Sequence, residues 1–250
     1  MTDNNNLPAQ VDGAAVVTDV VRRQLPTLAD VVPANFNEKR FGRLVVSAAK
    51  ATPQLMECFA TEAGQTSVAL AAIQAAALGL EPNTPLQEAW LLPQRNKDVQ
   101  ECRLQIGYKG LLKLARNNPD VKEIYAKVVY ANDAFDYVYG LNPTLTHKPT
   151  KGDKGKLKFA YGVVKFHSGG ADFVVLDEAD IAKRKEASRG SSSPSSPWQK
   201  WEAEMWQKSA LRRVLATAVS SPDLAQALAV DEQRLAVNNG TIVAALDAGS

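Results

Sequence analysis

Residues 101–116, ECRLQIGYKGLLKLAR, change from a strand-like to a helical pattern within a few positions. Up to residue 106, apolar side chains alternate with polar ones, which is typical of a half-buried strand. After Gly107, leucines recur at helical spacing and cations occupy the other side of the expected helix, residues 108–116. A strand that passes directly into an amphipathic helix predicts a domain that contains both α and β structure.

The segments around this stretch predict a hairpin and an antiparallel sheet. Residues 88–94 and 101–106 are strand-like, and the polar residues 95–98 between them form the expected hairpin tip. A glycine-containing turn at residues 167–170 joins two further strands. The expected strands after the hairpin cover residues 124–130, 135–139, 156–166 and 172–176, and the turn joins the last two.

Helices are expected on both sides of the strands. Thr66 or Ser67 can cap an Ala-rich helix that ends before Gly79, and Asp177 can cap another, with Asp180 at its third position. A Ser-rich loop at residues 189–197 precedes the last helix. The expected helices cover residues 37–50, 54–63, 66–78, 108–116, 177–187 and 198–218. The pattern predicts one α+β core domain, with an antiparallel sheet and a β-hairpin flanked by helices.

This core is expected to extend over residues 37–222. Residues 1–36 read as a flexible N-terminal arm that makes subunit contacts, with a short helix near residues 19–25. Residues 223–250 read as an acidic, partly disordered tail that frays after Pro222. The start of the chain lacks the pattern of a signal peptide, and the most apolar run, residues 68–80, is too short to cross a bilayer. We expect a cytoplasmic protein.

Charge is distributed unevenly, although the net charge is only +2. Lys and Arg gain affinity for phosphates by releasing condensed counterions, so a basic middle and an acidic end suit a protein that binds a polyanion. A solvated lysine-rich surface is the alternative. The basic residues of the middle are Arg95, Lys97, Arg103, Lys109, Lys113, Arg116, Lys122, Lys127, Lys148, Lys151, Lys154, Lys156, Lys158 and Lys165.

Two helices combine cations with aromatic residues. Lys109, Lys113 and Arg116 fall within one narrow arc, and Tyr108 at the start of that helix could stack on a base. In the last helix, Trp201 is expected to share a face with Lys208 and Arg212. The alternatives are a solvated amphipathic helix and, for Trp198, Trp201 and Trp206, anchors in a core or subunit interface.

Motifs for several enzyme classes are absent from the sequence. It contains no GxxxxGK[ST], GxGxxG, HExxH or GxSxG pattern, so nucleotide hydrolysis, dinucleotide chemistry, zinc proteolysis and α/β-hydrolase catalysis lack their usual residues. His147 and His167 read as structural or solvent-facing, and Cys58 and Cys102 as buried thiols. Carboxylates could hold Mg²⁺, but turn and N-cap roles explain them more simply. They are Asp133 with Asp136, and Asp177 with Glu178 and Asp180.

The order of motifs from residue 79 to residue 222 resembles the RecT/Redβ family of phage single-strand DNA annealing proteins. The resemblance begins with LGLEPNTPL at residues 78–86 and continues with the QIGYKG block at residues 105–110. The later matches are Asp133 with Phe135 and Gly140, His147 with Pro149, Ala160 with Tyr161, Pro197 with Trp198, Glu204 with Met205, Lys208, and Arg212 with Arg213.

This resemblance implies a set of DNA contacts and some departures from it. It favours Gln105, Tyr108, Lys109, Lys208, Arg212 and Arg213. The helical face adds Lys113 and Arg116, the aromatic argument adds Trp201, and the basic middle adds Lys127. Relatives commonly carry a Lys after the paired arginines and a Leu-Pro before the final helix, where this chain has Ala216, Ala218 and Val219. Lys183, Arg184 or Arg189 could replace that phosphate contact, and residues 191–196 resemble an insertion.

The resemblance also implies a function and partners. It predicts ATP-independent binding and annealing of single-stranded DNA in recombination, by a ring or helical filament of many subunits without a hydrolytic site. No cofactor is expected, and Mg²⁺ would act only as a modulator of DNA binding. The implied partners are single-stranded DNA, the annealed duplex, further copies of the chain, a 5′-to-3′ exonuclease and the host single-strand binding protein, in the bacterial cytoplasm. The alternatives are a Mg²⁺-dependent nuclease that uses the carboxylates above, and a phage scaffold protein.

Overall fold

The computed structural model describes residues 32–33, 36–188, 191–194 and 196–236, and the side chains within these ranges except those of 38 and 231–236. Its contacts group into two compact units, Met1–Gly110 and Leu111–Ser250. The helix expected near residues 19–25, and all but three residues of the predicted N-terminal arm, lie outside the described residues.

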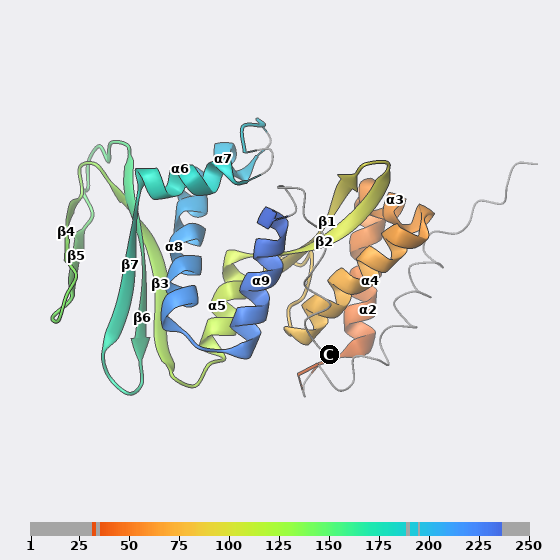
Figure 1. Ribbon diagram of the computed structural model, residues 1–250, viewed down its shortest axis with the longest axis horizontal. Helices are drawn as coiled ribbons and strands as arrows, with labels where there is room; N and C mark the ends of the chain where they lie inside the picture. The colour runs from red at the N-terminus through yellow and green to blue at the C-terminus, as the bar shows by residue number, and fades with distance from the viewer. Residues whose placement is uncertain (1–31, 34–35, 189–190, 195, 237–250) are drawn as a thin grey trace, which may run out of the picture. The chain divides into compact units, whose positions relative to one another are not determined.

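The first unit packs helices against a β-hairpin (Figure 1). Strands β1 (Ala89–Asn96) and β2 (Val99–Ile106) pair antiparallel, from Ala89 opposite Ile106 to Asn96 opposite Val99. The helices are α2 (Glu38–Ala51), α3 (Pro53–Glu57), the 3₁₀ helix η2 (Cys58–Ala60) and α4 (Glu62–Ala77). Helix α4 packs on β2, and its buried side chains are small, including Ala71, Ala72 and Ala75. The predicted hairpin is confirmed, with a tighter tip at Lys97 and Asp98.

The start of α4 differs from the prediction. Thr61 caps it, because its Oγ1 accepts a hydrogen bond from the backbone N of Gly64 at 3.1 Å. Ser67, one of the two expected caps, instead lies inside the helix. Its hydroxyl donates to the carbonyl of Gly64 at 2.6 Å and accepts from the backbone N of Cys102 at 2.8 Å. The predicted N-cap at Thr66 or Ser67 was therefore wrong, since both residues lie inside the helix. Ser67 instead uses its hydroxyl to join α4 to β2.

The two cysteines, Cys58 and Cys102, are both buried free thiols, as predicted. Burial raises the pKa of Cys58 to about 11 and raises that of Cys102 as well. Both residues therefore act as small apolar side chains in the core of the first unit.

The second unit is built on a three-stranded antiparallel sheet with the order β3–β6–β7 (Figure 1). A separate hairpin, β4–β5, and the helices α6 to α9 accompany this sheet, and the chain enters the unit through α5 (Tyr108–Arg116). The strands are β3 (Val121–Tyr130), β4 (Ala134–Val138), β5 (Thr144–Lys148), β6 (Leu157–Phe166) and β7 (Ala171–Asp177). The helices are α6 (Glu178–Glu186), α7 (Pro197–Lys200), α8 (Glu202–Ala218) and α9 (Pro222–Ala236).

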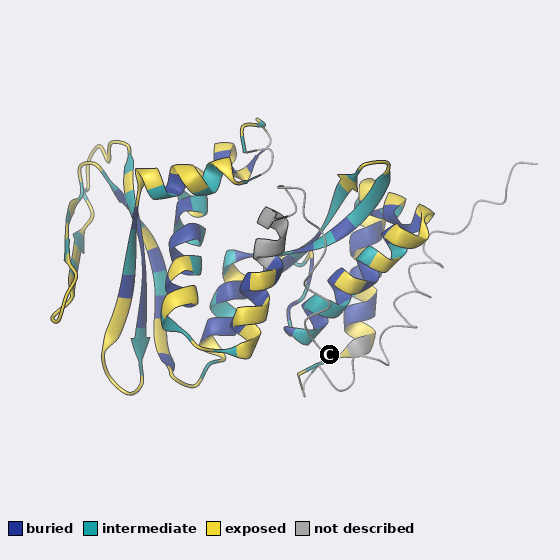
Figure 2. Ribbon diagram, viewed as in Figure 1, coloured by how far each residue is buried: buried dark blue, intermediate teal, exposed yellow. Residues whose placement is uncertain are grey.

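The two faces of the β3–β6–β7 sheet have different covers. Helix α8 contacts all three strands, and a Cβ placed on Gly162 would lie 2.7 Å from the carbonyl oxygen of Ala210 and 2.8 Å from Cγ1 of Val214. Neighbouring positions on β6 point the other way. There Tyr161 belongs to an aromatic cluster against which Phe135 of the β4–β5 hairpin packs. Residues 160–164 of β6 are all buried, because both faces of the sheet are covered there, and Figure 2 shows buried residues in the strands of this sheet and in α8.

The predicted fold class is confirmed as α+β, with a hairpin and antiparallel strands flanked by helices. Strand β5 was missed as a strand, because its polar residues 144–148 resemble a loop. The long helix expected at residues 198–218 is divided at Trp201, whose backbone leaves the helical region at φ −136° and ψ 56°. A break of one residue barely changes the apolar spacing, so periodicity did not reveal it.

The chain after Pro222 was expected to fray, and this was wrong for residues 222–236, which form α9. Leu224, Ala227, Leu228 and Val230 are buried at helical spacing, and α9 packs against α8. The acidic composition of the tail concealed this short apolar stripe. Residues 237–250 lie outside the described residues.

Candidate nucleic-acid interface

The LGLEPNTPL motif at residues 78–86 forms a turn that holds the start of β1. Asn83 has a left-handed backbone (φ 55°), its N donates to the carbonyl of Ala89 at 2.9 Å, and its Oδ1 accepts from the N of Leu91 at 2.8 Å. Asn tolerates this conformation because its short side chain can hydrogen-bond nearby backbone. The motif therefore has a clear structural role in the first unit.

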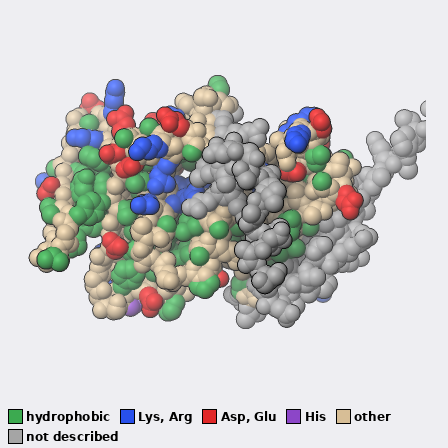
Figure 3. All heavy atoms as spheres, viewed as in Figure 1, with side chains coloured by type: hydrophobic (Ala, Val, Ile, Leu, Met, Phe, Trp, Pro, Cys, Tyr) green, Lys and Arg blue, Asp and Glu red, His purple; other side chains and the backbone are tan. Residues whose placement is uncertain are grey.

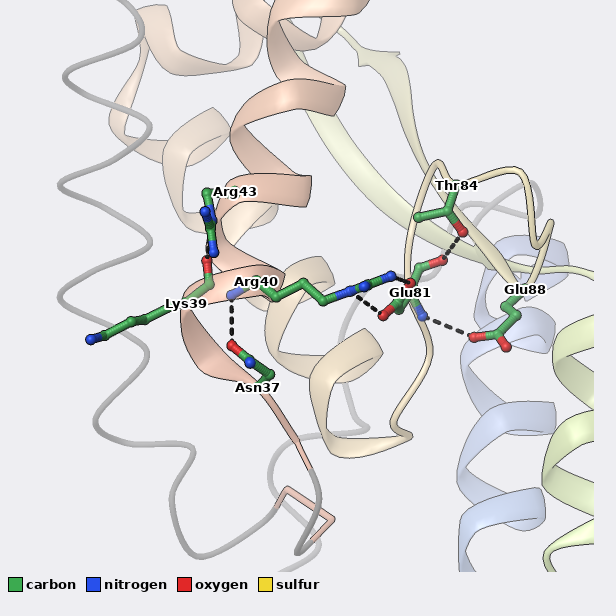
Figure 4. Close-up of polar contacts among 7 residues, drawn as sticks. All are labelled: Asn37, Lys39, Arg40, Arg43, Glu81, Thr84 and Glu88. Atoms are coloured by element: carbon green, nitrogen blue, oxygen red, sulfur yellow. Dashed lines mark hydrogen bonds and ion pairs between the residues drawn. The ribbon is translucent and has the colours of Figure 1, made fainter.

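A buried carboxylate joins this turn to the QIGYKG block. Glu88 is 8% exposed, its Oε2 accepts from the N of Glu81 at 3.1 Å, and its carbonyl accepts from the N of Gly107 at 2.8 Å. Glu81 in turn receives two hydrogen bonds of 2.8 Å from the guanidinium of Arg40, which raises the pKa of Arg40. Figure 4 shows Arg40 and Glu88 converging on Glu81 from different elements.

The two glycines of the QIGYKG block lie where there is no room for a side chain. A Cβ on Gly107 would overlap the carbonyl of Gln87 and the ring of Trp90, and one on Gly110 would overlap the carbonyl of Glu88. These close approaches place the first turn of α5 directly against the start of β1. Between the two glycines, Tyr108 is half-buried and Lys109 is exposed.

Helix α5 displays its cations as predicted. Lys109 and Arg116 are exposed and Lys113 is half-buried, all on one face. Leu111, Leu114 and Ala115 are buried on other faces, and the predicted apolar residue Leu112 is half-buried. Gln105, also predicted, is half-buried on β2 opposite Trp90.

Helix α8 presents a second cationic face. Lys208 and Arg212 lie one turn apart and are half-buried, while Arg213 is exposed about 100° further around the helix. Ala210, Leu211 and Val214 are fully buried toward the second unit's core. The sheet therefore fixes the side of α8 on which Lys208 and Arg212 lie.

Helix α6 adds cations beside those of α8 on the same face of the second unit. Asp177 is the predicted N-cap, and with Asp180 it forms a capping box in which the N of Asp180 donates to Asp177 Oδ1 at 2.9 Å. Near its other end Lys183 is exposed and Arg184 half-buried. Figure 3 shows Lys and Arg side chains gathered over α6 and the adjoining part of α8.

Lys127 is separated from these helices by the sheet. It is exposed on β3 and pairs in register with Tyr161, so both side chains lie on the β4–β5 side. Helix α8 covers the opposite side, at Gly162. The structure therefore does not bring Lys127 together with Lys208 and Arg212 within the second unit.

The tryptophans divide between the two expected roles. Trp198 and Trp206 are each 4% exposed and serve as core anchors. Trp201 is 56% exposed at the break between α7 and α8. Because its backbone is not helical, the helical spacing that predicted a face shared with Lys208 and Arg212 does not apply to Trp201, but its ring is accessible for stacking.

Among the carboxylates considered for Mg²⁺, Asp133, Asp177 and Asp180 have structural partners, and Asp136 and Glu178 are exposed. Asp133 Oδ2 accepts from the N of Tyr130 at 2.8 Å and from His147 Nε2 at 3.1 Å, and its Oδ1 accepts from the N of Thr150 at 2.8 Å. The hydroxyl of Tyr161 lies 3.1 Å from His147 Nδ1. Within the described part of the chain, no group of three His, Cys, Asp or Glu residues is arranged to hold a metal ion.

This Asp133–His147–Tyr161 network was not predicted, although the sequence contained a signal for it. All three residues occur in the motif order quoted above, far apart in the chain. Burial raises the pKa of Tyr161 to about 12, so its hydroxyl stays protonated and can donate to His147. Burial also acts to raise the pKa of Asp133, but the hydrogen bonds from Tyr130, Thr150 and His147 hold it below its usual value.

Comparison with known proteins identifies the family. The RecT family model matches residues 39–243, which is most of the chain. The chain belongs to the RecT family. Protein RecT of Escherichia coli strain K12 is 28% identical over 237 residues, which cover 93% of this chain and 86% of that protein. RecT-family membership makes this a DNA-binding protein of recombination and single-strand annealing.

The structure therefore describes a RecT-family chain with two cationic helical faces, one on α5 and one on α8. Among the described helices, none has both the length and the apolar character needed to span a membrane.

Proposed function

We propose that this RecT-family chain binds single-stranded DNA through the cationic faces of α5 and α8 and pairs complementary strands without ATP. The observation that carries the proposal is that each face has a buried apolar back. Leu111 and Leu114 hold α5, and Leu211 and Val214 hold α8. Lys109 and Arg212 are thereby presented from fixed helices, which limits the ordering cost when they bind phosphates.

Phosphate contacts of this kind act on any sequence, as an annealing protein requires. The Lys and Arg side chains bind the sugar-phosphate backbone, and Tyr108 or Trp201 can stack on any base. The free energy of annealing then comes from base pairing itself. In this proposal no bond is broken, no nucleotide is hydrolysed, and Mg²⁺ only modulates the affinity for DNA.

The carboxylates support this proposal over a Mg²⁺-dependent nuclease. Three donors engage Asp133, and Asp177 and Asp180 cap α6. A carboxylate that accepts several hydrogen bonds has fewer lone pairs for a metal ion.

We further propose that the protein works as a ring or helical filament in the bacterial cytoplasm. A 5′-to-3′ exonuclease would supply its single strands and the host single-strand binding protein would be a second partner. These steps rest on family membership and on the need to hold two strands together.

The test is strand annealing by the purified full chain with two complementary labelled oligonucleotides and no nucleotide, carried out once with Mg²⁺ and once with excess chelator. We expect annealing well above the spontaneous rate, and no shortened DNA product. A rate equal to the spontaneous one, with the DNA bound, would refute annealing. Cleavage products that disappear in an Asp133→Asn variant would instead support the nuclease.

A further inference from the structure

The loop between β5 and β6 is a second basic surface that the proposed strand-binding faces do not include. Residues 148–156, which are the last residue of β5 and the loop that follows it, contain four exposed lysines and one exposed acid, Asp153. The lysines are Lys148, Lys151, Lys154 and Lys156. We call these four residues the loop lysines. Figure 3 shows Lys and Arg side chains at the end of the sheet where this loop runs in Figure 1.

This loop is held in one conformation by hydrogen bonds to the turn that precedes β4. The N of Ala131 donates to the carbonyl of Lys156 at 2.8 Å, and Nδ2 of Asn132 donates to the carbonyl of Asp153 at 3.0 Å. The N of Thr150 donates to the buried Asp133. The loop backbone is therefore ordered before any ligand binds, so binding would cost less conformational entropy.

The acids near the loop lysines only partly offset their charge. Asp153 Oδ1 accepts from the N of Gly155 at 3.0 Å, which stabilises a turn where Gly155 has φ 71°. Asp136 is exposed on β4, two residues from the partner of Lys148. The Lys154 ammonium lies 5.3 Å from the ring centre of Tyr130. Cations beside a half-exposed aromatic ring are a combination that binds nucleic acid strands.

The β3–β6–β7 sheet separates Lys127 from α8. Lys127 lies three residues before Tyr130 on β3, and its side chain is on the sheet face opposite α8. A short stretch of backbone held by Lys208 and Arg212 cannot also touch Lys127 within one subunit, because the thickness of the sheet lies between them.

We propose that the loop lysines, with Lys127, bind the sugar-phosphate backbone of a second DNA strand while the first is held by the α5 and α8 faces. The proposal rests on the proposed function, since pairing requires that two strands are present on one assembly. This surface would hold the incoming strand through its sugar-phosphate backbone. Its bases would remain free to test for complementarity.

The experiment uses two oligothymidylates with different dyes, which cannot pair with each other. The full chain is saturated with the first, the second is titrated in across a salt series, and both dyes are followed so that exchange is distinguished from double occupancy. The test variant is the triple substitution Lys151→Ala, Lys154→Ala and Lys156→Ala. The matched control, Lys39→Ala with Lys50→Ala and Lys200→Ala, removes the same charge from exposed positions of α2 and α7.

We expect the triple loop variant to lose second-strand affinity by on the order of ten- to a hundredfold near 0.1 M salt. The slope of log affinity against log salt should fall by about 2, since each phosphate contact to a single strand contributes about 0.7. The triple loop variant should bind the first strand with wild-type affinity. The control variant should bind both strands with wild-type affinity. Second-strand capture equal to the control, or no double occupancy in the wild type, would overturn the inference and leave the proposed function intact. If the wild-type protein does not bind the first oligonucleotide at all, the proposed function is refuted instead.

Discussion

Helix α8 and the β4–β5 hairpin cover opposite faces of the β3–β6–β7 sheet by different physical means. Under α8 the contact is aliphatic and tight, and Gly162 lets the helix backbone approach β6. Under the hairpin the contact is aromatic, and it encloses the hydrogen bonds of Asp133, His147 and Tyr161. The α8 face thus depends on shape, whereas the hairpin face also depends on satisfied polar groups.

The largest expected effect comes from filling the close approach at Gly162. A Gly162→Val change would force α8 away from the sheet, because the new side chain meets the Ala210 carbonyl. We expect a loss of about 3 kcal/mol in the free energy of unfolding, measured with urea. Gly152→Val is the matched control, since a Cβ there meets nothing within 4 Å. Equal stability of the two variants would show that α8 does not pack closely at this point.

A smaller effect is expected from the polar network on the other face. Asp133→Asn removes the charge and weakens three hydrogen bonds, so we expect a loss of about 1–2 kcal/mol at pH 7. The folded-state pKa of Asp133 lies below the ordinary value of 3.8, so its contribution is present above that pH and is lost as pH falls through the folded-state pKa.

The stability difference between wild type and Asp133→Asn should therefore stay constant from about pH 7 to pH 5 and shrink below about pH 4. Urea unfolding at each pH measures it. A difference that instead grows as the pH falls would contradict the network described for Asp133.

Most of the fold could be predicted because local patterns were strong. The β1–β2 hairpin, the N-cap at Asp177 and the cationic arc of α5 each follow from alternation, cap chemistry or helical spacing within a short window. Strand β5 and helix α9 were missed, because the polar residues of β5 and the acidic composition of the tail conceal the positions that pack on other elements. His147 joins β5 to Tyr161, and Leu224 is buried where α9 meets α8.

The candidate site was predictable in part for the same reason. The faces of α5 and α8 follow from spacing, but the separation of Lys127 from α8 follows from strand register, which a sequence does not show. The role of Gly107 and Gly110 also depends on a distant contact, with Gln87, Glu88 and Trp90. The order of motifs singled out Gly107 and Gly110 as part of one block. The structure shows that both must be glycine because there is no room for a side chain.

Removal of single cations should change stability least. It is also the most direct test of the central claim. The measurement is the affinity of the full chain for a single-stranded oligonucleotide across a salt series, for the wild type and for Lys109→Ala, Arg212→Ala and Lys127→Ala, each checked by melting. We predict that Lys109→Ala and Arg212→Ala each reduce the slope of log affinity against log salt by about 0.7, whereas Lys127→Ala leaves the slope for the first strand unchanged. Wild-type slopes for Lys109→Ala and Arg212→Ala, with wild-type melting, would contradict the claim that the α5 and α8 faces bind the DNA backbone.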